Sequence, residues 1–210
     1  MRKTNERFFS HPPSLIPHPS LKMDLPERVR TVLEKRCRRT MEAGPVPAAV
    51  LLPLFLRNGT YHLLFTKRTN HLLHHSGEIS FPGGALNPEE EPEQGALRET
   101  WEEVGIHPTH VEVLGFLDDF YSIHHYLVTP LVGLIPGDYP YSVNPEEIER
   151  IIEVPVAHFL DSAVLRIEPR QWQGKSFVVR HYDYRGDDIW GLTAAILAQF
   201  LEIVFAGELG

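Results

Sequence analysis

The chain has 210 residues and a formal net charge of −8 at pH 7, and 42% of its residues are hydrophobic. This length and composition suit one globular domain with a buried core, and they exclude a fibrous or disordered chain. The excess of acidic residues excludes a net positive field for binding duplex nucleic acid. A single cysteine, Cys37, excludes an internal disulfide and a cysteine-based zinc framework.

No apolar run in the sequence predicts a membrane span. The run at residues 46–56 is shorter than the roughly 20 residues that cross a bilayer, and it contains two prolines. The more apolar run at residues 189–206 is interrupted by Gln199 and Glu202, which favours a buried helix. The first 20 residues lack the continuous apolar stretch of a signal peptide. We therefore expect a cytoplasmic protein, and its oligomeric state, a homodimer included, stays open.

The sequence divides into an N-terminal region, residues 1–45, and a larger domain, residues 46–210. Four prolines among the first 20 residues predict a loosely held arm. Residues 24–41 place Val29 and Leu33 at helical spacing among charged residues, which predicts one amphipathic helix. The basic cluster of this helix is interpreted as a solvated face in preference to a phosphate-binding site, and it consists of Lys35, Arg36, Arg38 and Arg39.

The larger domain is predicted to mix strands and helices. Two strands, residues 48–56 and 61–66, flank Asn58-Gly59, which is the strongest short signal for a hairpin. The remaining strands are predicted over residues 78–81, 111–117, 127–134, 165–167 and 177–184, with helices over residues 94–104 and from about residue 190. Because strands and helices interleave, we expect an α+β fold in which helices pack on a mixed sheet.

Three carboxylates gather on one face of the predicted helix at residues 94–104. Glu99, Glu102 and Glu103 are three and four positions apart, a spacing that places them side by side. Such like charges destabilise an isolated helix by a few tenths of a kcal/mol per pair, and a bound hard divalent cation reverses this cost. Mg²⁺ and Mn²⁺ prefer such oxygen ligands, although a cluster of this kind, taken alone, is more often a solvated face.

Two neighbours of these carboxylates have supporting roles. Arg98 can orient a carboxylate through a bidentate pair. Gly84, in the preceding loop, allows the chain to pass close to the helix and offers a backbone carbonyl as a further metal ligand.

The wider spacing around the carboxylates is more specific. Residues 84–106 resemble the signature of the Nudix hydrolase family, G-x5-E-x7-R-E-U-x-E-E-x-G-U, where U is a bulky aliphatic residue. The matching positions are Gly84, Glu90, Arg98, Glu99, Glu102, Glu103, Gly105 and Ile106. Thr100 alone departs from the pattern, at a position that is expected to face the core.

Segments outside the signature resemble one branch of the family, the coenzyme A pyrophosphatases. They are residues 64–84, 128–133, 144–148 and 189–194, and the similarity covers roughly residues 46–203. Leu73 stands where that branch usually has a basic residue. The resemblance leaves the first 45 residues unexplained.

The resemblance implies a Nudix fold, in which a mixed β-sheet is sandwiched between α-helices and the signature forms a loop, a helix and a loop. It also implies that Mg²⁺ or Mn²⁺ assists the hydrolysis of coenzyme A or acyl-coenzyme A to 3′,5′-ADP and 4′-phosphopantetheine. In this reading Glu99 and Glu103 are metal ligands and Glu90 supports them. Glu102 is a ligand or the general base, and Glu147 is the alternative base.

Three basic side chains are candidate contacts to substrate phosphates. Lys67 and Arg68 are candidates for the 3′-phosphate that distinguishes coenzyme A, and His75 could donate to a phosphate. The competing interpretation places Lys67 and Arg68 in solvent. For Glu147 the competing interpretation is a surface glutamate that starts a helix after Pro145.

Alternative functions stay open at this point. A Nudix hydrolase could instead act on ADP-ribose, NADH or a nucleotide-capped RNA. A protein of a different class could keep the fold and sense a nucleotide without cleaving it, although three intact carboxylates argue against such a sensor. A zinc site is disfavoured, because the local histidine groups come without cysteine or tight four-ligand spacing, and they are His71, His74, His75, His124 and His125.

Overall fold

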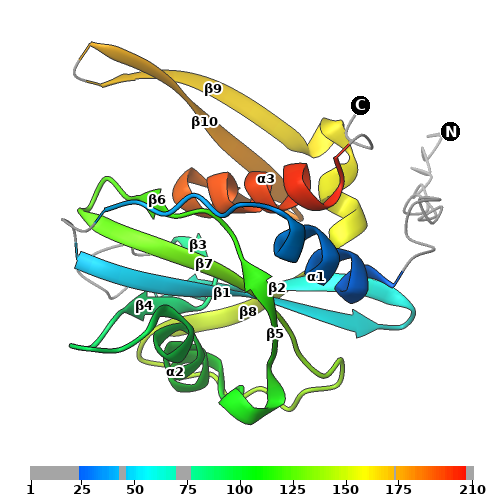
Figure 1. Cartoon of the computed structure of the whole chain (residues 1–210). Helices are drawn as coiled ribbons and strands as arrows, with labels where there is room; N and C mark the ends of the chain where they lie inside the picture. The colour runs from blue at the N-terminus through cyan, green and yellow to red at the C-terminus, as the bar shows by residue number, and fades with distance from the viewer. Residues whose placement is uncertain (1–23, 43–45, 70–76, 173, 207–210) are drawn as a thin grey trace, which may run out of the picture.

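The computed structural model describes residues 24–42, 46–69, 77–172 and 174–206 (Figure 1). The helices are α1 (Leu25–Lys35), α2 (Pro92–Val104) and α3 (Gly191–Val204), with 3₁₀ turns at Pro108–His110, Val156–Leu160 and Ser162–Val164. The strands are β1 (Val46–Arg57), β2 (Thr60–Arg68), β3 (Ile79–Ser80), β4 (Gly83–Ala85), β5 (Glu112–Phe116), β6 (Phe120–Tyr121), β7 (Tyr126–Leu134), β8 (Ile148–Pro155), β9 (Leu165–Trp172), β10 (Lys175–Tyr184) and β11 (Asp187–Trp190). The predicted arm at residues 1–20 and the candidate His75 lie outside the described residues.

A mixed sheet forms the centre of the fold. Its main path runs β3-β2-β1-β7-β5, while β4 pairs with β1, β6 with β7 and β8 with β2. The β1–β7 pair is parallel, and every other pair described in this sheet is antiparallel. The predicted hairpin at Asn58-Gly59 is confirmed: both residues have positive φ, 51° and 76°, as a two-residue turn of type I′ requires.

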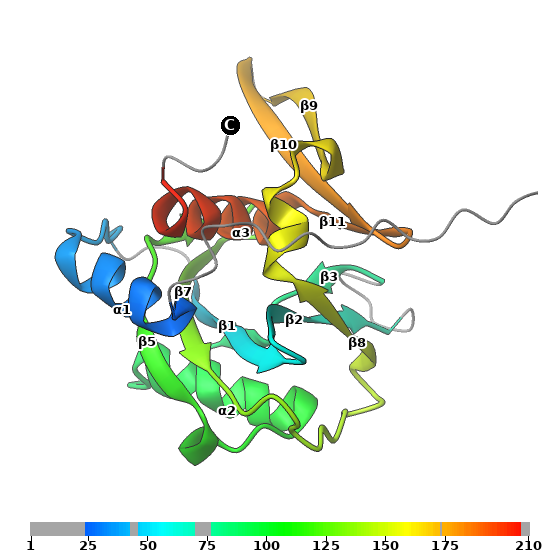
Figure 2. The same ribbon diagram turned by 90° about the vertical axis from the view of Figure 1, so that its right-hand side faces the viewer.

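The two faces of the sheet are covered by different helices (Figures 1 and 2). Alternate residues of β1 face the two sides of the sheet, because successive side chains of a strand point in opposite directions. Leu52 and Leu54 join the larger core with α1 and α3. Ala49 and Leu51 pack instead against Ala96 of α2. The expected α+β fold, a mixed sheet between helices, is therefore confirmed, and α2 lies alone on its face among the described helices.

The N-terminal helix is shorter than predicted, and its basic cluster is solvated only in part: Lys35 and Arg39 are exposed, whereas Arg36 and Arg38 are partly buried. α1 ends at Lys35, and residues 36–42 continue as an extended strap. Within the strap, Arg36 pairs with Asp118 and Arg38 pairs with the buried Asp119, both in the loop after β5. The prediction of a solvated face was wrong for Arg36 and Arg38, because their carboxylate partners lie far along the chain.

The boundary predicted at residue 46 stays a prediction. The described part of the N-terminal region is nonetheless integrated into the fold, since α1 contributes Leu25, Val29 and Leu33 to the larger core. Its hydrophobic residues recur at helical spacing and face the sheet, as an amphipathic helix should. Helix α1 therefore packs as part of the domain.

The C-terminal part of the chain adds a second, three-stranded sheet in the order β11-β10-β9. Its long β9–β10 hairpin projects from the body (Figure 1). Strand β9 continues five residues beyond the predicted end at residue 167, and the sequence does not predict β4, β6, β8 or β11. No helix within the described ranges is long and apolar enough to cross a bilayer.

Candidate active site

The carboxylates of the signature lie on α2, and the local sequence fixes where this helix begins and ends. Glu91 is the N-cap, and its side chain and that of Gln94 form a reciprocal capping box, with Pro92 at the first turn. Gly105 ends the helix in the left-handed conformation with φ of 77°. Thr100, the departure from the signature, is fully buried and donates a hydrogen bond to the Ala96 carbonyl at 2.6 Å. The expectation that this position faces the core is confirmed.

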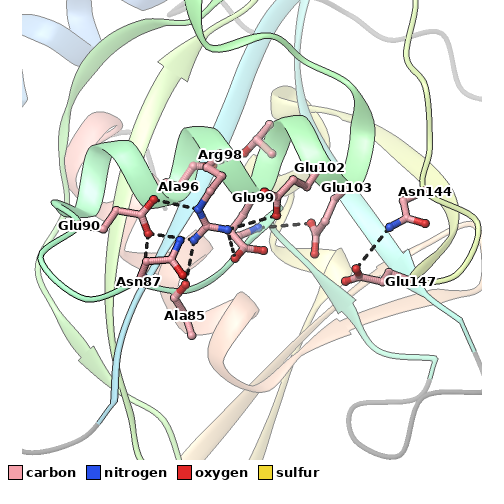
Figure 3. Close-up of polar contacts among 12 residues, drawn as sticks. Ala85, Asn87, Glu90, Ala96, Arg98, Glu99, Glu102, Glu103, Asn144 and Glu147 are labelled. Carbon is pink, nitrogen blue, oxygen red and sulfur yellow. Dashed lines mark hydrogen bonds and ion pairs between the residues drawn. The ribbon is translucent and has the colours of Figure 1, made fainter.

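Arg98 connects the carboxylates of the site (Figure 3). Its guanidinium forms a bidentate pair with Glu90, at 2.8 and 2.9 Å. The sequence predicts a bidentate pair with a carboxylate, and the structure identifies Glu90 as that carboxylate. The same group donates to Glu99 at 2.7 Å, to Glu102 at 3.2 Å and to the Ala85 carbonyl at 3.1 Å. The hydrogen bonds from Arg98 hold the pKa of Glu90 below its ordinary value. Glu90 and Arg98 thus orient the cluster from one end.

Glu99 lies directly against β4. A Cβ atom built on Gly84 would fall 2.6–2.9 Å from the carboxyl group of Glu99, closer than van der Waals contact allows. The glycine therefore provides the space that this carboxylate occupies. Gly84 and Glu99 are both in the signature, and their contact gives one physical reason for the spacing between them.

We expect Gly84→Ala to displace the Glu99 carboxylate and to lower kcat about tenfold, a typical cost of disturbing a metal-ligand environment. The φ angle of Gly84 lies outside the left-handed region, so alanine causes no backbone strain there. Circular dichroism melting should show a folded protein, and the Mg²⁺ concentration for half-maximal rate should rise. The control is Gly186→Ala in the β10–β11 turn: it has positive φ but nothing within 4 Å of its Cβ, so it tests strain alone. An unchanged Mg²⁺ requirement in Gly84→Ala would contradict the placement of Glu99.

Glu103 is the buried carboxylate of the site, with a residue exposure of 2%. Burial raises its pKa to about 8, against the opposing effect of the Arg68 guanidinium. Arg68 approaches it at 3.4 Å, and the backbone N–H of Gly83 donates to it at 3.3 Å. Such a carboxylate is costly to ionise without a further cation nearby.

The two basic candidates on β2 do not meet at one place. Arg68 faces the α2 side, where it contacts Glu103 and lies 3.9 Å from Glu147. Lys67 points to the other side, 3.9 Å from both Glu149 and Asp187. Strand alternation separates them, as it separates Leu64 from Phe65 earlier on β2. This arrangement therefore disfavours the binding of one phosphate group by Lys67 and Arg68 together.

Glu147 lies beside the cluster although it comes from outside the signature (Figure 3). It belongs to a turn before β8, and not to the start of a helix. The turn is held by Thr69, whose N–H donates to the Glu147 carbonyl at 2.8 Å. The side chain of Glu147 is 42% exposed and accepts a hydrogen bond from Asn144 at 3.3 Å. Glu102 is more open still, with a side-chain exposure of 54%.

The donor set of this cluster fits a hard divalent cation. Within the described ranges, no three His, Cys, Asp or Glu side chains are gathered closely enough to form a metal site as they stand. Yet Glu99 and Glu103 reach the β4 segment from one helix, all donors there are oxygens, and Gly84 leaves room for a carboxylate. Burial raises the pKa of Glu103 in spite of the nearby Arg68, so this arginine balances the charge of Glu103 only incompletely. A cation held by Glu99 and Glu103, with Glu102 at the open side, would complete the charge balance.

A family model and two relatives of known family match this chain. A family model described as the NUDIX domain matches residues 45–178. "Nudix hydrolase 15, mitochondrial" of Arabidopsis thaliana is 36% identical over 170 residues, which cover 77% of this chain and 59% of that protein. The "Uncharacterized Nudix hydrolase NudL" of Escherichia coli (strain K12) is 39% identical over 153 residues, covering 72% of this chain and 79% of that protein.

Among solved structures, DR0079 from Deinococcus radiodurans aligns with a TM-score of 0.50 at 16% identity, covering 77% of this chain and 88% of that one. This likeness concerns the fold alone. The family model spans the whole signature and the sheet around it. The chain belongs to the Nudix hydrolase family.

Proposed function

We propose that this protein hydrolyses the diphosphate of coenzyme A or acyl-coenzyme A, with Mg²⁺ or Mn²⁺, to 3′,5′-ADP and 4′-phosphopantetheine or its acyl derivative. The observation that carries the hydrolytic part is the intact carboxylate set of α2, in which Arg98 orients Glu99 and Glu102 and Glu103 is buried. The resemblance of residues 64–84 and 144–148 to the coenzyme A branch supports the choice of substrate. These two segments are in contact, since Thr69 of the first donates two hydrogen bonds to the loop of the second that contains Glu147.

Different residues of the site have different roles in an in-line displacement at phosphorus. When bound, Mg²⁺ or Mn²⁺ would neutralise charge on the diphosphate oxygens. Arg98 holds Glu99 and Glu102 in place, and Gly84 lets Glu99 approach the β4 segment. We assign the general base to Glu147, because its carboxylate lies next to the cluster and is open to water, whereas the carboxylate of Glu102 is held by Arg98. Positioning of water and diphosphate then supplies most of the rate acceleration.

The substrate is tested by product analysis. We expect mass spectrometry to find 3′,5′-ADP and phosphopantetheine after incubation of coenzyme A with the protein and Mg²⁺. We also expect 3′-dephospho-coenzyme A, ADP-ribose and NADH to be cleaved at least about tenfold more slowly, since loss of a charged contact typically costs that much. Preference for ADP-ribose or NADH would support diphosphate hydrolysis but contradict coenzyme A as the substrate. If none of the four compounds is cleaved, the proposed enzymatic activity is contradicted and a nucleotide sensor is favoured.

A further inference from the structure

The segment that contains Glu147 is attached to the end of the carboxylate helix through its main chain. The N–H of Ser142 donates to the Val104 carbonyl at 3.0 Å, and the N–H of Asn144 donates to the Glu103 carbonyl at 2.9 Å. The last carbonyls of a helix have no partner within it, so these two bonds use groups that would otherwise need water. The position of Asn144 is thereby set by the main chain of Glu103.

The side chain of Asn144 extends this attachment to Glu147. Its Nδ2 donates to Oε1 of Glu147 at 3.3 Å, while its Oδ1 accepts from the N–H of Glu146 at 3.1 Å. Its carbonyl also accepts from the N–H of Glu147 at 3.2 Å. One residue therefore contacts the carboxylate helix with its N–H and the carboxylate of Glu147 with its amide (Figure 3).

A half-exposed glutamate needs such a contact if it is to act on a defined atom. A glutamate side chain has several rotatable bonds, and a general base works only within hydrogen-bond reach of the proton that it accepts. Arg68 lies 3.9 Å from the second oxygen of Glu147, beyond hydrogen-bond distance. Among the contacts described for this carboxylate, the one at hydrogen-bond length comes from Asn144.

We propose that Asn144 is a positioning residue, which fixes the carboxylate of Glu147 relative to Glu103 so that Glu147 accepts the proton of the attacking water. This proposal rests on the proposed function. In the step concerned, the water oxygen forms a bond to phosphorus and its proton passes to Glu147. The bond between phosphorus and the bridging oxygen breaks, and that oxygen leaves with the electron pair.

Asn144→Ser separates this role from the folding of the turn. Serine can accept from the N–H of residue 146 and keep the turn, and both main-chain bonds remain, but its hydroxyl is too short to reach Glu147. We expect kcat for coenzyme A to fall about tenfold with KM changed by less than about threefold, as for the loss of an orienting contact. In a Glu147→Gln background the same substitution should cause no further loss, because residues that act as a unit are not additive.

The matched control is Thr69→Val. It removes the hydrogen bond of 3.2 Å from Oγ1 to the Glu146 carbonyl, in the same turn, without touching the Glu147 carboxylate. This variant should retain kcat within about twofold, as expected for a contact that supports the turn alone.

Equal losses in the two variants, an unchanged kcat in Asn144→Ser, or additivity with Glu147→Gln would each overturn the positioning role while wild-type hydrolysis stood. If wild-type protein prefers another nucleoside diphosphate, the comparison is made on that substrate. Hydrolysis of no substrate by wild-type protein would instead overturn the proposed function and the positioning role together.

Discussion

Replacing Glu103 by glutamine is expected to lower kcat about 1,000-fold and, at the same time, to stabilise the metal-free protein at alkaline pH. The loss of rate follows from removing a metal ligand whose contribution is worth about 4 kcal/mol. The gain in stability follows from burial, because the pKa of Glu103 is raised to about 8. Glutamine keeps the shape of the side chain and removes the charge that is costly to bury.

The direction of the pH dependence can be derived from this pKa. The carboxyl group ionises near its ordinary value of 4.5 in the unfolded chain and near 8 in the folded protein. Between these two values the folded protein binds more protons, so its free energy of unfolding falls as the pH rises. Well above pH 8 the full cost, on the order of 5 kcal/mol for such a shift, is present in wild type and absent in Glu103→Gln.

Thermal melts between pH 4 and pH 9 in the presence of EDTA provide the measurement. The two proteins should melt together near pH 4, and Glu103→Gln should melt higher by about 10 °C at pH 9. Mg²⁺ should raise the melting temperature of wild type at pH 9 more than that of the variant. Glu102→Gln is the control on the same helix, since its half-exposed side chain offers no buried charge to remove. Parallel pH curves for wild type and Glu103→Gln would contradict the burial of this charge.

Local chemistry explains which elements the sequence predicts correctly. The turn at Asn58-Gly59 needs positive φ at both residues, and few other dipeptides adopt it, so the hairpin is predicted at the right position. Strand β8 is different: its apolar residues Ile148, Ile151 and Ile152 have the three-and-four spacing of a helix, and Pro145 precedes them like a helix start. Pairing with β2 decides in favour of a strand, and this pairing is a long-range contact.

In the candidate site, too, some features follow from local sequence and others depend on long-range contacts. The shared face of Glu99, Glu102 and Glu103 follows from spacing, because helix geometry fixes their relative positions. Glu90 precedes the helix, so its bidentate pair with Arg98 does not follow from helix spacing. The orientation of Arg68 does not follow from spacing. Alternation along β2 predicts that Lys67 and Arg68 face opposite sides, but the helix that covers each side is known only from the fold. The same holds for Arg36 and Arg38, whose carboxylate partners belong to the loop after β5.

Arg98→Lys is expected to lower kcat about 100-fold at saturating Mg²⁺, at the upper end of costs for residues that orient metal ligands. Arginine has five N–H donors in a fixed fork. All five are used here: two on Glu90, one each on Glu99 and Glu102, and one on the Ala85 carbonyl. Lysine keeps the positive charge but has three donors at one point, so it cannot hold three carboxylates and a carbonyl together. Steady-state kinetics over a range of Mg²⁺ concentrations measures the loss.

Two further variants decide whether geometry or charge is responsible. Arg30→Lys changes an arginine that pairs with the exposed Glu112, and an exposed pair contributes little, so kcat should stay within about twofold. Glu90→Gln leaves Arg98 charged but weakens the bidentate pair that orients it, and we expect it to reproduce part of the loss. Full activity in Arg98→Lys would show that charge alone suffices. A loss in Arg98→Lys with none in Glu90→Gln would mean that Arg98 is oriented by Glu99, Glu102 and the Ala85 carbonyl without Glu90. A loss in both variants would give a physical reason why the signature keeps an acidic residue eight positions before its arginine.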